Sequence, residues 1–287
     1  MMPNEQLISD NQWTEIIKPK GKWFDLKLKE VWDYRDLISI FVRRDVISSY
    51  KQTILGPIWF FLGPLLTVVL YTFVFGSIAN IPTDGIPAPL FYLAGTTLWN
   101  YFANCFSGAS STFSSNSNLF GKVYFPRLVA PLSMVISNLL RTLIQFIMFM
   151  AFWVYYYAQG KVDFSWHMLW FPYLIVLMAL LALGIGIAIS AFTTKYRDLN
   201  NFIPIGVNIL MYASPVIYPT SLVPTKFQAF LWYNPLQHII DCFRYAFTGG
   251  GHLDLGGLFY STLFTLIALF VGIMLFNRTE RTFMDTV

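Results

Sequence analysis

Charged side chains are scarce in this sequence. Asp, Glu, Lys and Arg together make up 12% of its 287 residues, whereas hydrophobic residues make up 56%. Soluble domains carry about 25% charged residues, so a soluble fold of this length would lack the polar surface that water requires. Helices satisfy their own backbone hydrogen bonds in lipid. The composition therefore excludes an ordinary soluble protein and predicts an all-α membrane protein.

Catalytic and metal-binding motifs are also missing. There is no GxxxxGK[ST] loop, so this chain has no phosphate-cradling nucleotide site of its own. The patterns HExxH, CxxC and GxSxG are absent too. The three histidines are scattered, and Cys105 and Cys242 define neither a disulfide framework nor a zinc site. These absences predict no catalytic residue, no metal site and no cofactor bound by this chain.

Acidic residues are missing from the depth of every predicted span. Proton-coupled carriers usually need them there, so the energy for any transport is predicted to come from a partner. The cations, by contrast, are clustered, with nine of the 19 Lys and Arg residues before Gly56. No aromatic-interleaved basic motif accompanies them, which argues against a nucleic-acid partner. Because Lys and Arg stay on the cytoplasmic side, the cluster predicts a cytoplasmic N-terminus.

Six apolar stretches are long enough to be membrane helices. The loops 114–127 and 193–200 each carry two Lys or Arg residues and are predicted inside, whereas 79–88 carries none and is predicted outside. Both termini then lie in the cytoplasm. Gly184 and Gly186 permit close helix contact in the fourth span. The predicted spans are 57–78, 89–113, 128–157, 168–192, 201–218 and 257–276.

Two segments outside these spans have helical patterns of their own. Residues 30–53 alternate apolar and charged faces, with Tyr34 on the apolar face and Arg43 and Arg44 on another. This predicts an amphipathic interface helix, compatible with packing on a soluble partner. Residues 225–250 form two short apolar pieces split by Asn234-Pro235, which predicts either a re-entrant hairpin that dips in from outside or a surface amphipathic pair.

Polar residues on this hairpin share one helical face. Gln237, Asp241 and Arg244 are spaced for that face, and His238 is adjacent. They would meet a transported substrate at the outer exit, or they would simply face water. The second alternative is favoured, because a helix on a surface needs a polar side.

Arg141 is the one full charge well inside a predicted span. Its burial costs at least about 2.5 kcal/mol, so it is expected to face the bundle interior or water. It contacts a substrate phosphate, pairs across a pore, or bonds backbone carbonyls.

Aromatic residues make up 18% of the chain. Most of them fit interfacial belts, but some are candidates for a substrate path along which sugar rings lie on aromatic faces. These candidates are Tyr71, Phe75, Trp99, Tyr101 and Tyr212.

Taken together, these features resemble the permeases of ABC type-2 exporters, in the polysaccharide and polyol-phosphate group that includes O-antigen and teichoic-acid permeases. The resemblance extends from about Leu26 to the C-terminus. It rests on the order and spacing of the segments RDLISIFVRRDVISSYKQTILGPIWFFLGPLL, FPRLVAPLS, KYRDLNNFIPIGVNILMYASPVIYP, NPLQHIIDCFRYAFTG and ERTFMDTV.

The resemblance implies a homodimer in the bacterial inner membrane, bound to two ATPase subunits that hold ATP and Mg²⁺. Its cargo would be an undecaprenyl-diphosphate-linked glycan. The hairpin would be the pair of short outer helices near the exit. Two cytoplasmic loops would seat on the ATPase. The residues implied in this coupling are Asn118, Lys122, Arg127, Lys195, Arg197 and Asp198.

The expected organisation has three parts: a cytoplasmic tail with the interface helix over 1–56, a six-span domain over 57–276, and a cytoplasmic tail over 277–287.

The alternative functions are an exporter of small hydrophobic drugs or lipids, a membrane-embedded transferase and a non-catalytic scaffold. A transferase would need inward-facing acidic or His residues near a membrane surface, and none are found.

Overall fold

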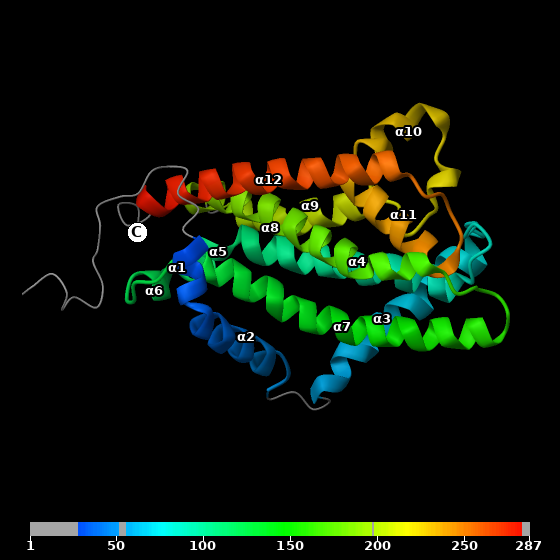
Figure 1. Cartoon of the computed structure of the whole chain (residues 1–287), viewed down its shortest axis with the longest axis horizontal. Coiled ribbons are helices and arrows are strands. Elements are labelled where there is room, and N and C mark those ends of the chain that lie inside the picture. Colours follow the sequence, from blue (N-terminus) through cyan, green and yellow to red (C-terminus); the bar gives the residue numbers. More distant parts are fainter. Residues whose placement is uncertain (1–27, 52–55, 197, 283–287) are drawn as a thin grey trace, which may run out of the picture.

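The structure, a computed structural model, describes residues 28–51, 56–196 and 198–282. Throughout these ranges the ordered elements are helices, without a strand, which confirms the all-α prediction. The helices pack side by side in an elongated bundle (Figure 1). They are α1 (Leu28–Asp33), α2 (Arg35–Tyr50), α3 (Trp59–Tyr71), α4 (Ala88–Ser110), α5 (Thr112–Ser115), α6 (Ser117–Phe120), α7 (Val129–Ala158), α8 (Phe171–Lys195), α9 (Leu199–Tyr212), α10 (Thr225–Trp232), α11 (Pro235–Thr248) and α12 (Leu255–Thr282).

Four helical segments among the described residues are long and apolar enough to cross a membrane: Trp59–Ile78, Val129–Ala158, Trp166–Lys195 and Leu255–Glu280. They confirm four of the predicted spans. The first includes the π-helical turn Thr72–Ile78 after α3, and the third includes a 3₁₀ turn before α8. The last helix runs to Thr282, beyond the predicted boundary at 276.

The other two predicted spans differ from the prediction. Helix α4 has 23 residues, about 35 Å, but it is not among the four, because Asn100 and Asn104, with hydroxyl residues such as Thr96 and Thr97, lower its hydropathy. Helix α9 has only 14 residues, about 21 Å, and ends at Tyr212 rather than at 218. The structure therefore supports four spans by length and composition.

Helix α4 forms the centre of the bundle and packs against α7 and α8, while α8 packs along α12. Glycines allow this last contact. A Cβ on Gly184 would lie 2.7 Å from the backbone N of Leu269, and one on Gly272 would lie 2.2 Å from the carbonyl O of Gly184. The predicted role of Gly184 in close helix packing is confirmed, and Gly186 similarly faces Ala109.

The connecting segments gather at two opposite ends of the bundle (Figure 1). At the α6 end, which holds α5, α6 and the end of α12, Arg127 Nη1 donates to the Glu280 carbonyl at 2.8 Å. At the α10 end, which holds loops 79–87 and 159–165, α10 and α11, Ser221 Oγ donates to Asp84 Oδ1 at 2.7 Å. Segments predicted inside lie at the α6 end, and those predicted outside lie at the α10 end.

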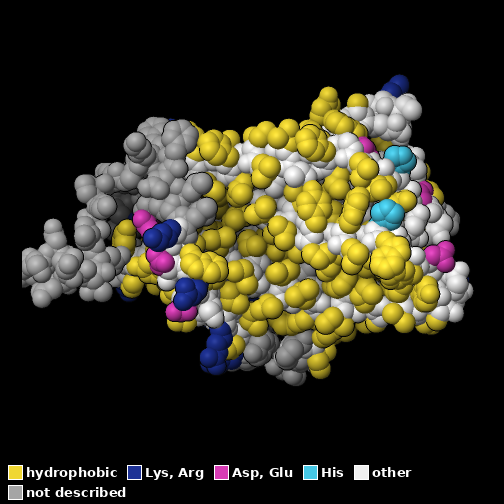
Figure 2. Space-filling view, in the orientation of Figure 1, with side chains coloured by type: hydrophobic (Ala, Val, Ile, Leu, Met, Phe, Trp, Pro, Cys, Tyr) yellow, Lys and Arg dark blue, Asp and Glu magenta, His cyan; other side chains and the backbone are white. Residues whose placement is uncertain are grey.

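The surface has the distribution that a bilayer requires. Hydrophobic side chains cover the middle of the visible face, whereas charged side chains and histidines gather toward the two ends (Figure 2). Exposed aromatic and aliphatic residues continue this apolar belt on several helices, as Phe73 on the first span, Ile147 on α7 and Phe259 on α12 show. Such a belt would be unstable in water and is stable in lipid.

The N-terminal prediction needs a correction. Residues 30–53 do not form one helix, because the chain leaves helical geometry at Tyr34 (φ −92°, ψ 21°) between α1 and α2. Helix α2 lies against α7, and its Phe41 is buried edge-on to Phe125, in the segment just before α7, at 5.8 Å. Apolar Ile40 is 62% exposed, so the helix is apolar on more than its packed side.

The prediction of a polar loop over 114–127 is also partly wrong, because the short helices α5 and α6 occupy the first half of this stretch. The two short helices predicted between 225 and 250 are confirmed as α10 and α11. Asn234 Oδ1 caps α11 by accepting from the Leu236 N–H at 3.1 Å, and Pro235 follows it. Gly249, at φ 67°, ends the helix in a left-handed conformation.

Candidate functional site

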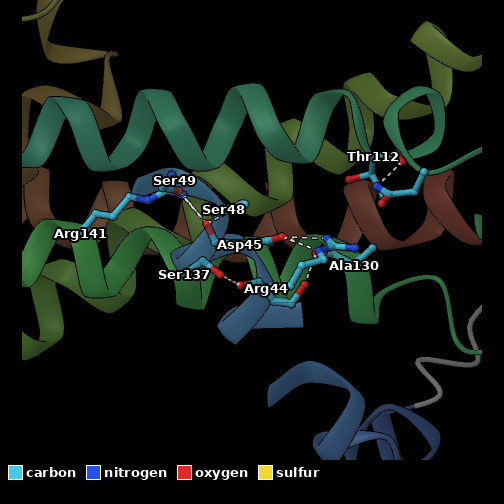
Figure 3. A network of polar contacts seen from close by, with 10 residues as sticks. Arg44, Asp45, Ser48, Ser49, Thr112, Ala130, Ser137 and Arg141 are labelled. Atoms are coloured by element: carbon cyan, nitrogen blue, oxygen red, sulfur yellow. Dashed lines mark hydrogen bonds and ion pairs between the residues drawn. The ribbon is translucent and has the colours of Figure 1, made fainter. Parts of the chain in front are cut away.

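Arg141 of α7 joins this helix to α2. Its guanidinium donates to the Asn138 side chain at 3.0 Å, to the Asp45 carbonyl at 3.2 Å and to the hydroxyl of Ser49. Figure 3 shows Arg141 reaching from α7 to Ser49 on α2. Asp45 and Ser49 lie in the last two turns of α2, where the helix dipole favours a cation.

The carboxylate of Asp45 is not the partner of Arg141. It pairs instead with Arg44 at 2.8 Å, as the dashed lines in Figure 3 indicate. Arg141 is therefore held by a backbone carbonyl and by neutral side chains. This geometry supports the carbonyl-bonding alternative for Arg141, and a substrate contact stays a prediction. Sequence reasoning missed Asp45 and Ser49, because nothing in their spacing indicates a partner 96 or 92 residues away.

The predicted coupling residues divide into two kinds. Asn118, Lys122, Lys195 and Asp198 are exposed at the α6 end, where a partner can reach them. Arg127 is half-buried, bonds the Glu280 carbonyl and lies 5.5 Å above the Phe120 ring. Burial lowers the pKa of its guanidinium, and nearby Glu280 opposes that shift. Arg127 thus anchors this end of the bundle, while Arg197 lies outside the described residues.

The predicted substrate-path residues are not all brought together. Tyr71 and Phe75 are neighbours at 5.3 Å, and Tyr71 also lies 6.1 Å from Tyr92, which sequence reasoning missed. Trp99 and Tyr101 are buried inside the bundle. Tyr212, by contrast, is 61% exposed at the end of α9.

A pocket of about 540 Å³ opens at the α10 end. We call it the α11 pocket. Its walls come from α10, α11, loop 84–86, segment 219–221 and loop 250–254. All four predicted outer-exit residues line it: Gln237, His238, Asp241 and Arg244.

The favoured expectation for these four residues was wrong. They do not simply face water, because Gln237, His238 and Arg244 are 7%, 3% and 3% exposed. The physical reason is that the segment after α9 and the loop before α4 fold back over this face of α11.

Arg244 is held by main-chain groups of that segment. Its Nη1 and Nη2 donate to the Pro215 and Val216 carbonyls at 2.5 and 2.6 Å. The guanidinium stacks 3.7 Å from the Phe91 ring, with Asp241 at 4.0 Å. Gly95 gives it room, since a Cβ there would lie 2.6 Å from Nη2.

The rest of the pocket is polar and includes residues that sequence reasoning missed. Thr220 Oγ1 donates to Asp241 at 2.5 Å, and the Trp232 indole donates to Asp254 at 3.1 Å. His238 Nε2 lies 2.8 Å from the Trp232 carbonyl. The backbone N–H of Gly257 lowers the pKa of the Asp254 carboxyl. Over the described part of the chain no group of His, Cys, Asp and Glu could hold a metal.

Replacing Arg244 with Leu is predicted to destabilise the α10 end. The carbonyls of Pro215 and Val216 would lose their donors, which costs about 1–3 kcal/mol for each buried group. Arg244→Lys keeps the charge but loses the planar fork, so its melting temperature should fall between those of wild type and Arg244→Leu. Thermal unfolding in detergent measures this.

The matched control is Lys226→Leu, which removes an exposed cation from α10 at the same end. It should melt like wild type. Equal melting temperatures for Arg244→Leu and Lys226→Leu would contradict the structural role of Arg244.

Comparison with known proteins shows which family this chain belongs to. Residues 36–248 match the ABC-2 type transporter family. The chain is 28% identical to the O-antigen export system permease protein RfbA of Klebsiella pneumoniae, over 91% of this chain and 98% of that protein. It is 24% identical to RfbA of Myxococcus xanthus over 91% and 98%, and 25% identical to the polysialic acid transport protein KpsM of Escherichia coli over 83% and 91%. The family match covers well over half of the chain, and this protein therefore belongs to the ABC-2 type transporter family.

Proposed function

We propose that this chain is the membrane permease subunit of an ATP-driven exporter that moves a lipid-linked polysaccharide, of the O-antigen or capsule class, across the bacterial inner membrane. The observation that carries the proposal is similarity over nine-tenths of the chain to permeases named for O-antigen export. The apolar belt between two polar ends supports it, because only a membrane protein is stable with that surface.

Six crossings with both termini in the cytoplasm make up the proposed topology. The second crossing is α4, which is long enough but is shielded by its neighbours, so hydroxyl residues are tolerated in it. The fifth is α9 together with the irregular segment 213–219. The hairpin of α10 and α11 then re-enters from outside. The separation of the loops between the two ends of the bundle supports this arrangement.

Energy is proposed to come from two ATPase subunits bound to a homodimer of this chain. They would hold ATP and Mg²⁺ and would dock on the α6 end through the exposed Asn118, Lys122, Lys195 and Asp198, with Arg127 supporting that surface. A partner that binds one conformation more tightly shifts the equilibrium of the permease. The Arg141 contact with Asp45 and Ser49 would transmit such a shift from α2 to α7.

The glycan is proposed to pass between the two permeases along aromatic side chains. The cluster of Tyr71, Phe75 and Tyr92 supports this, because sugar C–H faces lie against rings while hydroxyls bond phenols. Tyr212 is exposed on α9 and is available to the same path in a dimer. Trp99 and Tyr101, which are buried, would support the path from behind.

Deletion of this chain is predicted to abolish surface polysaccharide and to leave lipid-linked glycan inside the cell. The reason is that a sugar chain cannot cross the hydrocarbon core unaided. Surface glycan is measured by antibody or lectin binding on intact cells, and internal glycan after lysis. In the deletion strain, the wild-type chain should restore surface glycan when its ATPase partner is intact. It should not do so when that partner lacks its catalytic base. Unchanged surface glycan in the deletion strain would refute the proposal.

Arg141→Leu is predicted to lower export in the same assay while membrane insertion stays normal. Loss of a partly buried cation at the end of α2 weakens the α2–α7 contact by about 1–2 kcal/mol. Arg141→Lys, which retains the charge, should export at an intermediate level. Lys161→Leu removes an exposed cation at the opposite end and serves as the control. Wild-type export by Arg141→Leu would show that this contact does not transmit movement.

A further inference from the structure

Gln237 has a buried polar atom that nothing in the described protein satisfies. Its side chain is 7% exposed and lines the α11 pocket, yet Oε1 has no hydrogen-bond partner among the described residues. An unsatisfied buried carbonyl costs free energy, so such atoms point to a missing partner. The pocket volume of about 540 Å³ is within the range of small-molecule sites. Gln237 is therefore placed to accept a hydrogen bond from a bound ligand.

The charged side chains around the pocket indicate which ligand charge it can accommodate. Asp84, Asp241 and Asp254 all line it. Arg244 lines it as well, and its Nη1 and Nη2 are held by two carbonyls, with an aromatic ring and Asp241 beside them, whereas its Nε has no partner among the described residues. Three carboxylates against one arginine disfavour an anionic ligand such as a phosphate or an acidic sugar.

A metal cation is disfavoured as well. The charge of Asp241 is compensated by Arg244 at 4.0 Å and by the hydroxyl of Thr220 at 2.5 Å. Asp254 already accepts from the Trp232 indole and from the Gly257 backbone. The groups left to bind are the Gln237 carbonyl and the carboxylate oxygens, which accept, and Arg244 Nε, which donates and has no partner among the described residues. A matching ligand is therefore neutral and carries groups that both donate and accept, as hydroxyls do.

The pocket also has an aromatic wall whose position is fixed. Trp232 is 39% exposed, and its indole is tied to Asp254 and stacked 5.1 Å from Tyr260. An aromatic ring beside amide and carboxylate acceptors suits a sugar, whose hydroxyls donate hydrogen bonds while its C–H face packs on the ring.

We infer that the α11 pocket binds a neutral, hydroxyl-rich sugar unit of the exported glycan, with Gln237 and Asp241 accepting its hydroxyl protons and Trp232 packing on its ring. This inference rests on the proposed function, which supplies the glycan. It places a sugar-binding site at the end of the bundle opposite the proposed ATPase surface. A glycan segment held there would be on the far side of the membrane.

The test uses the full chain in lipid nanodiscs. The probe is the lipid-free polysaccharide released by mild acid from cells that carry this chain, and binding is followed by calorimetry. Wild type should bind it, and Gln237→Leu should weaken binding about tenfold, as expected for one lost hydrogen bond in a dry site. Gln159→Leu, an exposed glutamine at the same end but outside the pocket, should bind like wild type. Thermal unfolding confirms that each variant is folded.

Several outcomes would overturn the inference. These are no binding to wild type, equal binding by wild type and Gln237→Leu, or heat of binding from calcium chloride or inorganic phosphate alone. A chain that restores surface glycan in cells but fails this binding test refutes the sugar site and leaves the proposed function intact. Normal surface glycan without the chain refutes the proposed function, whatever the binding result.

Discussion

The α10 end of this protein depends on how the chain satisfies its backbone after α9. The helix ends at Tyr212, and the irregular residues that follow cannot leave carbonyls unpaired inside a membrane bundle. Arg244 donates to the carbonyls of Pro215 and Val216, and Asn234 donates to the carbonyl of Ala213 at 3.2 Å. Helix α11 thus bonds the irregular segment at two places, through Asn234 at its N-terminus and through Arg244 further along. The α11 pocket forms between this helix and the irregular segment.

Arg141, at the other side of the bundle, also donates to a backbone carbonyl of a segment distant in sequence. Its guanidinium bonds a carbonyl near the end of α2 instead of a carboxylate. Each arginine therefore joins two elements distant in sequence, 96 residues apart for Arg141 and 28 or 29 for Arg244. Neither is a bare charge, since backbone carbonyls accept hydrogen bonds from both guanidinium groups and Asp241 lies beside Arg244 at 4.0 Å.

The sequence alone predicted the parts of the fold that hydropathy and helix-end chemistry determine. Four long apolar helices lie where they were expected, and Asn234, Pro235 and Gly249 delimit α11. The close contact at Gly184 was also foreseen, because only small residues let helices approach so closely.

Properties that depend on distant contacts could not be predicted. The polar face of α11 was expected to meet water, but it is covered by segments that follow α9 and precede α4. No local signal places Trp232, Asp254 and Thr220 around that face, because they come from three different elements. The early end of α9, by contrast, had a local signal that sequence reasoning missed, because Pro215 follows the C-cap residue Ala213 by two positions and keeps the residue before it out of helical geometry.

The proposed topology places the two ends of the bundle on opposite sides of the inner membrane, with the α6 end in the cytoplasm. Labelling of single cysteines in intact cells with a membrane-impermeant maleimide tests this. Gln159→Cys and Lys122→Cys are exposed at the α10 and α6 ends, whereas native Cys105 and Cys242 are buried. We expect labelling at 159 before lysis and at 122 only after lysis. Labelling at 122 in intact cells would contradict this topology.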